Sequence, residues 1–166
     1  MGDQLHIECA KLADAQEIYA LYHDLIDMPY STWDEEYPTL EIVIEDLRSH
    51  DVLIMKDESG SIAAAIAIWQ EMEFADAADW YADVKRWAML SRLGVHRAYQ
   101  GRGIAKQMLN AAMAFARGKG CEAVQFLVAK SNPIAQRAYA PLGFDVCGEV
   151  EMFGPGEIWL CYQKRL

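Results

Sequence analysis

The sequence predicts one mixed α/β domain. Short apolar segments that alternate with polar residues, or run unbroken between turn residues, are typical of strands, and longer segments repeat their apolar residues at helical spacing. The 166 residues, 53% of them hydrophobic, are enough for a sizeable core and exclude a disordered chain. No repeat, linker or low-complexity segment divides the sequence, so residues 1–166 are expected to form a single domain.

The N-terminal half predicts a strand, two helices and a hairpin. Residues 5–9 alternate as a half-buried strand does. Asp14 and Glu17 have the spacing of a capping box, so the first helix would start there, and Thr39 would cap the second helix. The apolar face of the first helix would hold Ile18, Leu21, Tyr22 and Leu25. Two apolar runs around a DESG turn predict the hairpin: residues 52–55 and 62–69.

The C-terminal half predicts helices alternating with strands. Residues 71–83, rich in acids and alanine, fit no element. A long strand over 87–95 precedes a helix whose apolar residues begin at Ile104. Asn132 and Pro133 start a short helix, because asparagine caps a helix and proline fits its first turn. Further strands are expected at 124–128, 145–153 and 157–164.

Charge and cysteine content limit the partners and the compartment. The formal net charge is −10 and the sequence pI is about 4.8, which opposes binding to nucleic acid or an anionic membrane but is compatible with a cationic small molecule or peptide. The cysteines and histidines lack the spacing of a zinc site. The chain opens without a secretory signal, and its longest apolar run, residues 62–69, is too short to span a bilayer. We therefore expect a cytoplasmic protein with reduced thiols.

A turn that contains two glycines joins the strand at 87–95 to the following helix. The segment reads HRAYQGRGIAKQML (96–109), with Gly101 and Gly103 just before the helix. The first amides of a helix lack internal partners and carry the positive end of its dipole, and glycines let them approach a phosphate. The alternative is that both glycines only make a tight turn. The segment lacks the GxxxxGK[ST] of a P-loop and the third glycine of GxGxxG, so neither of those phosphate sites is expected.

Two segments together resemble the signatures of the GNAT N-acetyltransferase family. LGVHRAYQGRGIAKQML is similar to the acetyl-CoA-binding pattern of that family, which falls here on Leu93, Val95, Gln100, Gly103 and Ala105. SNPIAQRAYAPLGF is similar to the second signature, with the expected spacing of Asn132, Ala135, Tyr139, Gly143 and Phe144. The order of the predicted elements agrees along the whole chain. The resemblance implies a GNAT-like acyl-CoA N-acyltransferase fold, in which helices flank a central mixed, mostly antiparallel sheet.

The resemblance also implies acetyl-CoA as the co-substrate. The backbone of Leu93, Gly94 and Val95 would pair with the pantetheine arm as an added strand does. The Arg102 side chain would either add charge at the phosphates or lie on the surface. Asn132 would position the cofactor arm while it caps its own helix, and no metal is expected. Backbone amides of the loop and the first helical turn would hold the pyrophosphate: Gln100, Gly101, Arg102, Gly103, Ile104 and Ala105.

The implied reaction is direct attack of an acceptor amine on the acetyl thioester. A backbone amide around Leu93 and Gly94 would stabilise the oxyanion. Tyr139 would protonate the leaving thiolate, because a phenol carries a donor proton and the position matches that of the family. The alternative is a core tyrosine that covers Gly143 and Phe144.

The sequence identifies the general base less clearly than it identifies Tyr139 as the general acid. Many family members carry a glutamate early in their fourth strand, but residues 87–95 contain no acid. Glu71 and Glu73 follow the preceding strand and could reach the acceptor, so Glu71 is the expected base, acting directly or through water. The alternative is that both glutamates belong to a solvated loop.

The expected acceptor is a primary amine of a small molecule or peptide, and the charge pattern favours a cationic one. Acids cluster at 34–41 and 71–83, the two regions that border the acceptor site in the family. Trp33 and Tyr37 interleave with the first cluster, and aromatic rings beside carboxylates suit a cation, so with Glu73 they are the expected acceptor-binding residues. The alternative is that a protein of this charge has acids everywhere. Four tryptophans would shape either an acyl pocket or a homodimer face: Trp33, Trp69, Trp80 and Trp87.

A function of another class is a non-catalytic module that binds acyl-CoA and regulates a partner. The sequence keeps Tyr139 together with the glycine-containing loop, which favours the enzyme. An assay of acetyl transfer distinguishes the two.

Overall fold

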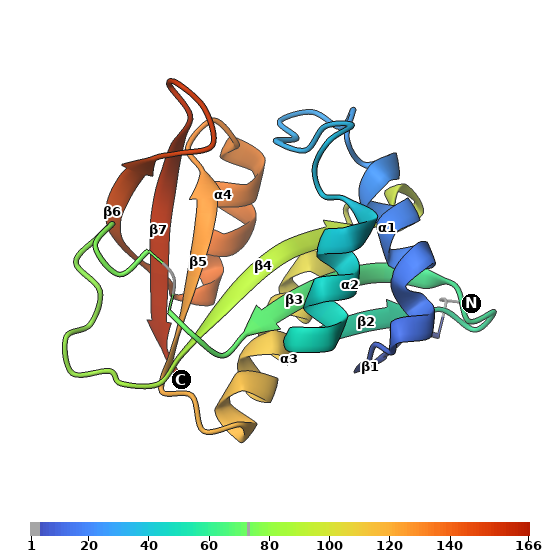
Figure 1. The fold of residues 1–166 in the computed structure, drawn as a ribbon, viewed down its shortest axis with the longest axis horizontal. Coiled ribbons are helices and arrows are strands. Elements are labelled where there is room, and N and C mark those ends of the chain that lie inside the picture. Colours follow the sequence, from blue (N-terminus) through green and yellow to red (C-terminus); the bar gives the residue numbers. More distant parts are fainter. Residues whose placement is uncertain (1–3, 73) are drawn as a thin grey trace. The chain divides into compact units, whose positions relative to one another are not determined.

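The computed structural model describes residues 4–72 and 74–166 (Figure 1). Its contacts divide the chain into two compact units. The first unit runs to Ile68 and resumes over Arg92–Ala112, and the second comprises Trp69–Ser91 and Met113–Leu166. Strand β4 (Trp87–Val95) and helix α3 (Ile104–Gly118) each pass from one unit into the other. The single domain over residues 1–166 stays a prediction.

The strands form a seven-stranded sheet in the order β1-β2-β3-β4-β5-β7-β6. All the described pairs are antiparallel except β4 with β5, which is parallel. The prediction of a mixed, mostly antiparallel sheet is therefore confirmed. The remaining strands are β1 (His6–Cys9), β2 (Asp51–Lys56), β3 (Ile62–Trp69), β5 (Ala123–Ala129), β6 (Asp145–Glu151) and β7 (Ile158–Arg165).

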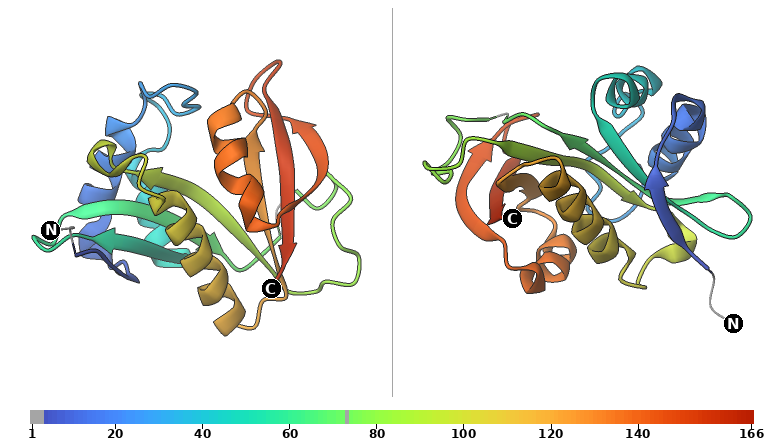
Figure 2. Two further views of the ribbon diagram at one scale, coloured as in Figure 1. Left: turned by 180° about the vertical axis from the view of Figure 1, so that it is seen from behind. Right: turned by 90° about the horizontal axis from the view of Figure 1, so that it is seen from below.

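In the first unit, helices cover both faces of β1–β3. Helices α1 (Ala15–Asp24) and α2 (Leu40–Ser49) lie on one face and α3 on the other (Figure 2). The predicted apolar face of α1 is confirmed, since Ile18 and Tyr22 are each only 1% exposed. Thr39 caps α2 as predicted: its Oγ1 accepts the Ile42 N–H at 3.1 Å.

The start of α1 differs from the prediction. A short 3₁₀ turn (Leu12–Asp14) precedes the helix, so Asp14 already has helical backbone angles. The Asp14 carboxylate turns back to accept the Lys11 N–H at 2.8 Å. Glu17 accepts the backbone N–H of Ile62 at 3.0 Å instead of closing a capping box. The predicted capping box is therefore wrong, because both carboxylates have other backbone partners.

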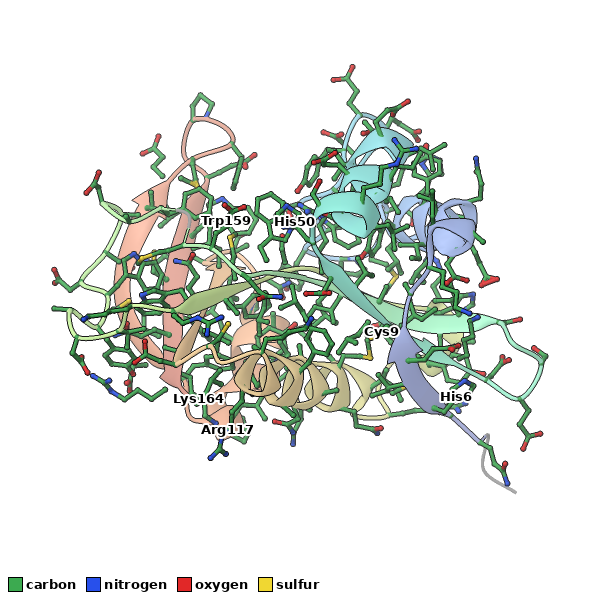
Figure 3. All side chains as sticks on the ribbon, turned by 60° about the horizontal axis from the view of Figure 1, so that its bottom comes forward. His6, Cys9, His50, Arg117, Trp159 and Lys164 are labelled. Atoms are coloured by element: carbon green, nitrogen blue, oxygen red, sulfur yellow. The ribbon has the colours of Figure 1, made fainter. Side chains whose placement is uncertain are left out.

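In the second unit, α4 (Pro133–Tyr139) lies beside β5 and β7 (Figure 1). Asn132 caps it as predicted, with its Oδ1 accepting the Ala135 N–H at 3.0 Å. After α4 the chain turns at Gly143 (φ 78°). Lys164 of β7, labelled in Figure 3, donates to the carbonyl of Leu142 at 2.5 Å and holds this turn to the sheet.

The segment between β3 and β4 forms neither helix nor strand in its described residues. It is nevertheless fixed to β6 and β7 at several points. The Asp79 N–H donates to the Cys147 carbonyl at 3.2 Å, and the Tyr81 N–H donates to Gln163 Oε1 at 2.9 Å. The Tyr81 ring stacks on Trp87 at 6.2 Å. Among the described residues no helix is long and apolar enough to cross a membrane.

Candidate active site

The glycine-containing loop runs from the end of β4 to the start of α3. Gly101 has φ 76° and Gly103 has φ 74°, a left-handed conformation that glycine adopts without steric cost. A Cβ atom at either position would meet nothing within 4 Å. Backbone conformation, not crowding by the protein, therefore explains the two glycines, and the space beside them is open.

The open space lies at the amide end of α3. The first helical hydrogen bond runs from the Gln107 N–H to the Gly103 carbonyl at 3.2 Å. The preceding N–H groups, on Ile104, Ala105 and Lys106, have no acceptor one turn back within the helix. Those amides and the helix dipole favour an anion at this end. The residues present fit the pyrophosphate of acetyl-CoA.

Side chains hold the loop in shape. The Gln100 Nε2 donates to the Val95 carbonyl at 2.7 Å, so this side chain braces the turn from within. The Tyr99 hydroxyl donates to Asp57 Oδ2 of the β2–β3 turn at 3.1 Å. The Arg102 guanidinium lies over the Tyr99 ring, 5.1 Å from its centroid, which keeps this cation beside the loop.

The backbone of β4 before the loop is irregular at Arg92. The β4–β5 ladder ends at the pair Leu90 and Phe126. Arg92 then has φ 49°, an uncommon conformation for a residue with a side chain. Gly94 is buried against α1, where a Cβ would lie 3.0 Å from the Tyr22 ring. A side chain at this position would therefore press against the Tyr22 ring.

A buried ion pair in this part of β4 is not predicted from the sequence. Arg92 donates from Nε to Asp46 Oδ2 at 2.8 Å and from Nη2 to Asp46 Oδ1 at 2.5 Å. The two side chains are 8% and 4% exposed. Burial lowers the pKa of Arg92, but the hydrogen bonds and charge of Asp46 outweigh it, so the net shift is upward and the guanidinium stays charged. The feature of the sequence that could have indicated this pair is Arg92, a charged residue within the long apolar strand predicted at 87–95.

Two of the predicted acceptor residues lie against this ion pair and its neighbour Tyr22. The Tyr37 hydroxyl accepts from Arg92 Nη1 at 3.1 Å, and the Tyr37 side chain is 39% exposed. Trp33 packs edge-on against Tyr22, with the ring centroids 4.9 Å apart. The structure therefore brings Tyr37 to Arg92 of β4 and Trp33 to Tyr22.

Tyr139 ends α4 in the second unit. Its ring lies 5.5 Å from that of Phe126 on β5. Burial, with a smaller contribution from Tyr162, raises the pKa of Tyr139 to about 12, so its hydroxyl is protonated at neutral pH. Within the described part of the chain, no group forms a hydrogen bond with this hydroxyl. The contact with Phe126 agrees with a tyrosine of the core. The protonated hydroxyl agrees with a general acid that protonates the leaving thiolate.

The structure gives little evidence on the predicted general base. Glu71 is exposed in the segment after β3, and Glu73 lies outside the described residues. The role of Glu71 stays a prediction. Over residues 4–72 and 74–166, no group of His, Cys, Asp and Glu side chains is arranged to hold a metal ion.

Comparison with known proteins identifies the family to which this chain belongs. The acetyltransferase (GNAT) family matches residues 18–144, more than half of the chain. The chain belongs to the GNAT family. A search of curated proteins found no significant match.

Solved structures share the GNAT fold of this chain. A protein of Acinetobacter baylyi ADP1, provisionally described as an acetyltransferase, has a TM-score of 0.78 at 17% identity, over 100% of this chain and 95% of its own. An N-acetyltransferase of Staphylococcus aureus Mu50 has a TM-score of 0.74 at 19% identity, over 98% of both chains. yncA of Salmonella typhimurium, solved with its cofactor acetyl-CoA, has a TM-score of 0.73 at 20% identity, over 98% of this chain and 94% of its own. These identities support the fold and leave the acceptor open.

Proposed function

We propose that the protein transfers the acetyl group of acetyl-CoA to a primary amine of a small molecule or peptide. One observation carries the proposal: in a GNAT chain, Gly101 and Gly103 leave open space at the amide end of α3. A P-loop or Rossmann protein could present a similar helix end, but this chain has neither motif.

The residues that hold acetyl-CoA are those of the loop and of β4. The amides from Gln100 to Ala105 bind the pyrophosphate, and Arg102 adds positive charge beside it. The backbone of Leu93–Val95 lies beyond the last β4–β5 pair, which leaves it suited to pair with an extended pantetheine arm. Asn132 positions the arm from the start of α4.

The reaction is one nucleophilic displacement at the acetyl carbon. The amine nitrogen forms the new C–N bond, and the C–S bond breaks as the tetrahedral intermediate collapses. An amide of Leu93 or Gly94 donates to the oxyanion. The amine attacks in its neutral form, and Glu71, directly or through water, accepts the proton that its nitrogen loses as the amide forms. Tyr139, whose raised pKa keeps its hydroxyl protonated at neutral pH, gives its proton to the leaving sulfur and regains one from solvent.

The acceptor is a cationic amine. Trp33 and Tyr37 supply aromatic surface beside Tyr22 and Arg92, and the net charge of −10 attracts a cation. Glu73 stays an expected acceptor-binding residue from the sequence. The same negative net charge disfavours binding to nucleic acid and to anionic membranes. A cytoplasmic location and a homodimer complete the proposal as expectations from the sequence.

Thermal unfolding with and without acetyl-CoA tests the cofactor. At about 100 times its Kd the ligand adds about 2.7 kcal/mol, or roughly 5 °C or more in Tm for a chain of this size. Dephospho-CoA and adenosine nucleotides serve as controls that show which parts of acetyl-CoA contribute to binding. No shift at millimolar acetyl-CoA would contradict the proposal at its strongest point.

A screen of amines tests the acceptor. Cationic amines should react fastest, and their advantage should shrink as salt rises, because salt screens the attraction. If neutral or acidic amines react best, the cationic acceptor is wrong while acetyl transfer itself stands.

A further inference from the structure

Tyr22 of α1 touches β4 at two residues that flank Leu93. Its hydroxyl donates to the Arg92 carbonyl at 2.7 Å. Its ring lies against Gly94, where a Cβ would come within 3.0 Å. Tyr22 is 1% exposed, and Trp33 packs against its ring. The tyrosine is therefore held firmly against this part of β4.

The residue that Tyr22 holds is strained. Arg92 has φ 49° within a strand, and such a conformation persists only where the surroundings fix it. Asp46 holds the Arg92 side chain with two hydrogen bonds. Tyr22 holds the carbonyl, which is the part of Arg92 that belongs to the next peptide group.

That peptide group links the carbonyl to a candidate catalytic amide. A peptide is planar and, when trans, points its C=O and N–H in opposite directions. The Arg92 carbonyl and the Leu93 N–H belong to one such plane. When Tyr22 fixes the carbonyl on the α1 side, it fixes the Leu93 N–H on the other side.

We propose that Tyr22 is a positioning residue for acyl transfer, whose hydroxyl orients the Leu93 N–H toward the developing oxyanion through the Arg92–Leu93 peptide. The inference rests on the proposed function, since it needs an acyl group beside Leu93. Burial raises the pKa of Tyr22 above its ordinary value, so the hydroxyl keeps its proton and donates throughout the assay range. The hydroxyl has no contact with the reacting atoms in this account.

Tyr22→Phe is the direct test, because it keeps the ring against Gly94 and removes only the donor. We expect kcat to fall by about ten-fold or more while the Kd for acetyl-CoA changes by less than about three-fold. Tyr19→Phe on the same helix is the matched control for the substitution and should keep the wild-type kcat. Ile18→Val, also on α1 and buried, controls for lost stability and should lower Tm without lowering kcat.

A second measurement does not depend on whether the variant folds. In the wild-type protein, the Leu93 amide proton should shift in the NMR spectrum when a ketone analogue of acetyl-CoA binds. Wild-type kcat in folded Tyr22→Phe, a kcat loss of equal size in Ile18→Val, or an unresponsive Leu93 amide overturns the inference. If wild-type protein binds no acetyl-CoA, the proposed function fails first and the inference falls with it; if it acetylates amines and Tyr22→Phe does so equally well, only the inference fails.

Discussion

The Arg92 guanidinium and the Asp46 carboxylate form a two-point ion pair between β4 and α2, with hydrogen bonds of 2.8 and 2.5 Å. Arg92 has φ 49° and lies immediately before the backbone that we propose for the thioester. This pair therefore supports the part of the fold on which the proposed chemistry depends.

Breaking that pair should destabilise the protein strongly. Asp46→Asn leaves the Arg92 charge buried without its carboxylate, and we expect a loss of about 3–5 kcal/mol in the free energy of unfolding. Chemical denaturation measures it. Glu45→Gln, at the neighbouring exposed position on α2, should stay within about 0.5 kcal/mol of wild type. Equal stability of the two variants would show that Asp46 contributes little.

Gly103→Val should abolish the Tm shift with acetyl-CoA, because a branched side chain enters the space left for the phosphates. Gly60 offers a matched control in the β2–β3 turn, since it has φ 84° and equally open surroundings. Both variants force a valine into the left-handed region and should lose about 1–2 kcal/mol. Loss of the ligand-induced shift in Gly60→Val as well would mean that strain alone disrupts binding.

Tyr139→Phe should lower kcat by about 10²–10⁴-fold, because it removes the proton proposed for the leaving sulfur. The ring contact with Phe126 survives the change, so Tm and the Kd for acetyl-CoA should stay near wild type. Steady-state kinetics and calorimetry measure these quantities. An unchanged kcat would assign Tyr139 to the core alone.

The ionisation of Tyr139 gives a prediction that needs no substrate. Burial raises its pKa to about 12, so the folded protein holds this proton while the unfolded chain releases it near pH 10. The stability contributed by the neutral phenol is complete below pH 10 and is lost as the pH rises toward 12. Difference absorbance between wild type and Tyr139→Phe should place the transition near 12. A transition near 10 would contradict the raised pKa of Tyr139.

Local patterns predicted much of the fold. The predicted limits of β3 and β4 coincide with the observed ones, and both Thr39 and Asn132 cap helices as their positions indicate. These features depend on residues a few positions apart. The glycine-containing loop was predicted for the same reason, because its conformation and the following helix start are both local.

Long-range partners were beyond the sequence analysis. Asp46 looks like a solvated residue of α2, and only the fold shows that Arg92 reaches it. The capping box failed because Ile62, 45 positions from Glu17, competes for its carboxylate. The segment after β3 shows no helical or strand pattern of its own. Its position depends on contacts with other strands, where Gln163 and Trp87 hold Tyr81.

Mass-spectrometric detection of acetylated product, with wild-type protein, acetyl-CoA and a panel of amines, tests acetyl transfer most directly. We predict that a cationic primary amine becomes acetylated, that free CoA thiol appears in equal amount, and that Tyr139→Phe forms the same product far more slowly. Acetyl-CoA binding with no product from any class of amine would contradict acetyl transfer and would favour a module that only binds acyl-CoA.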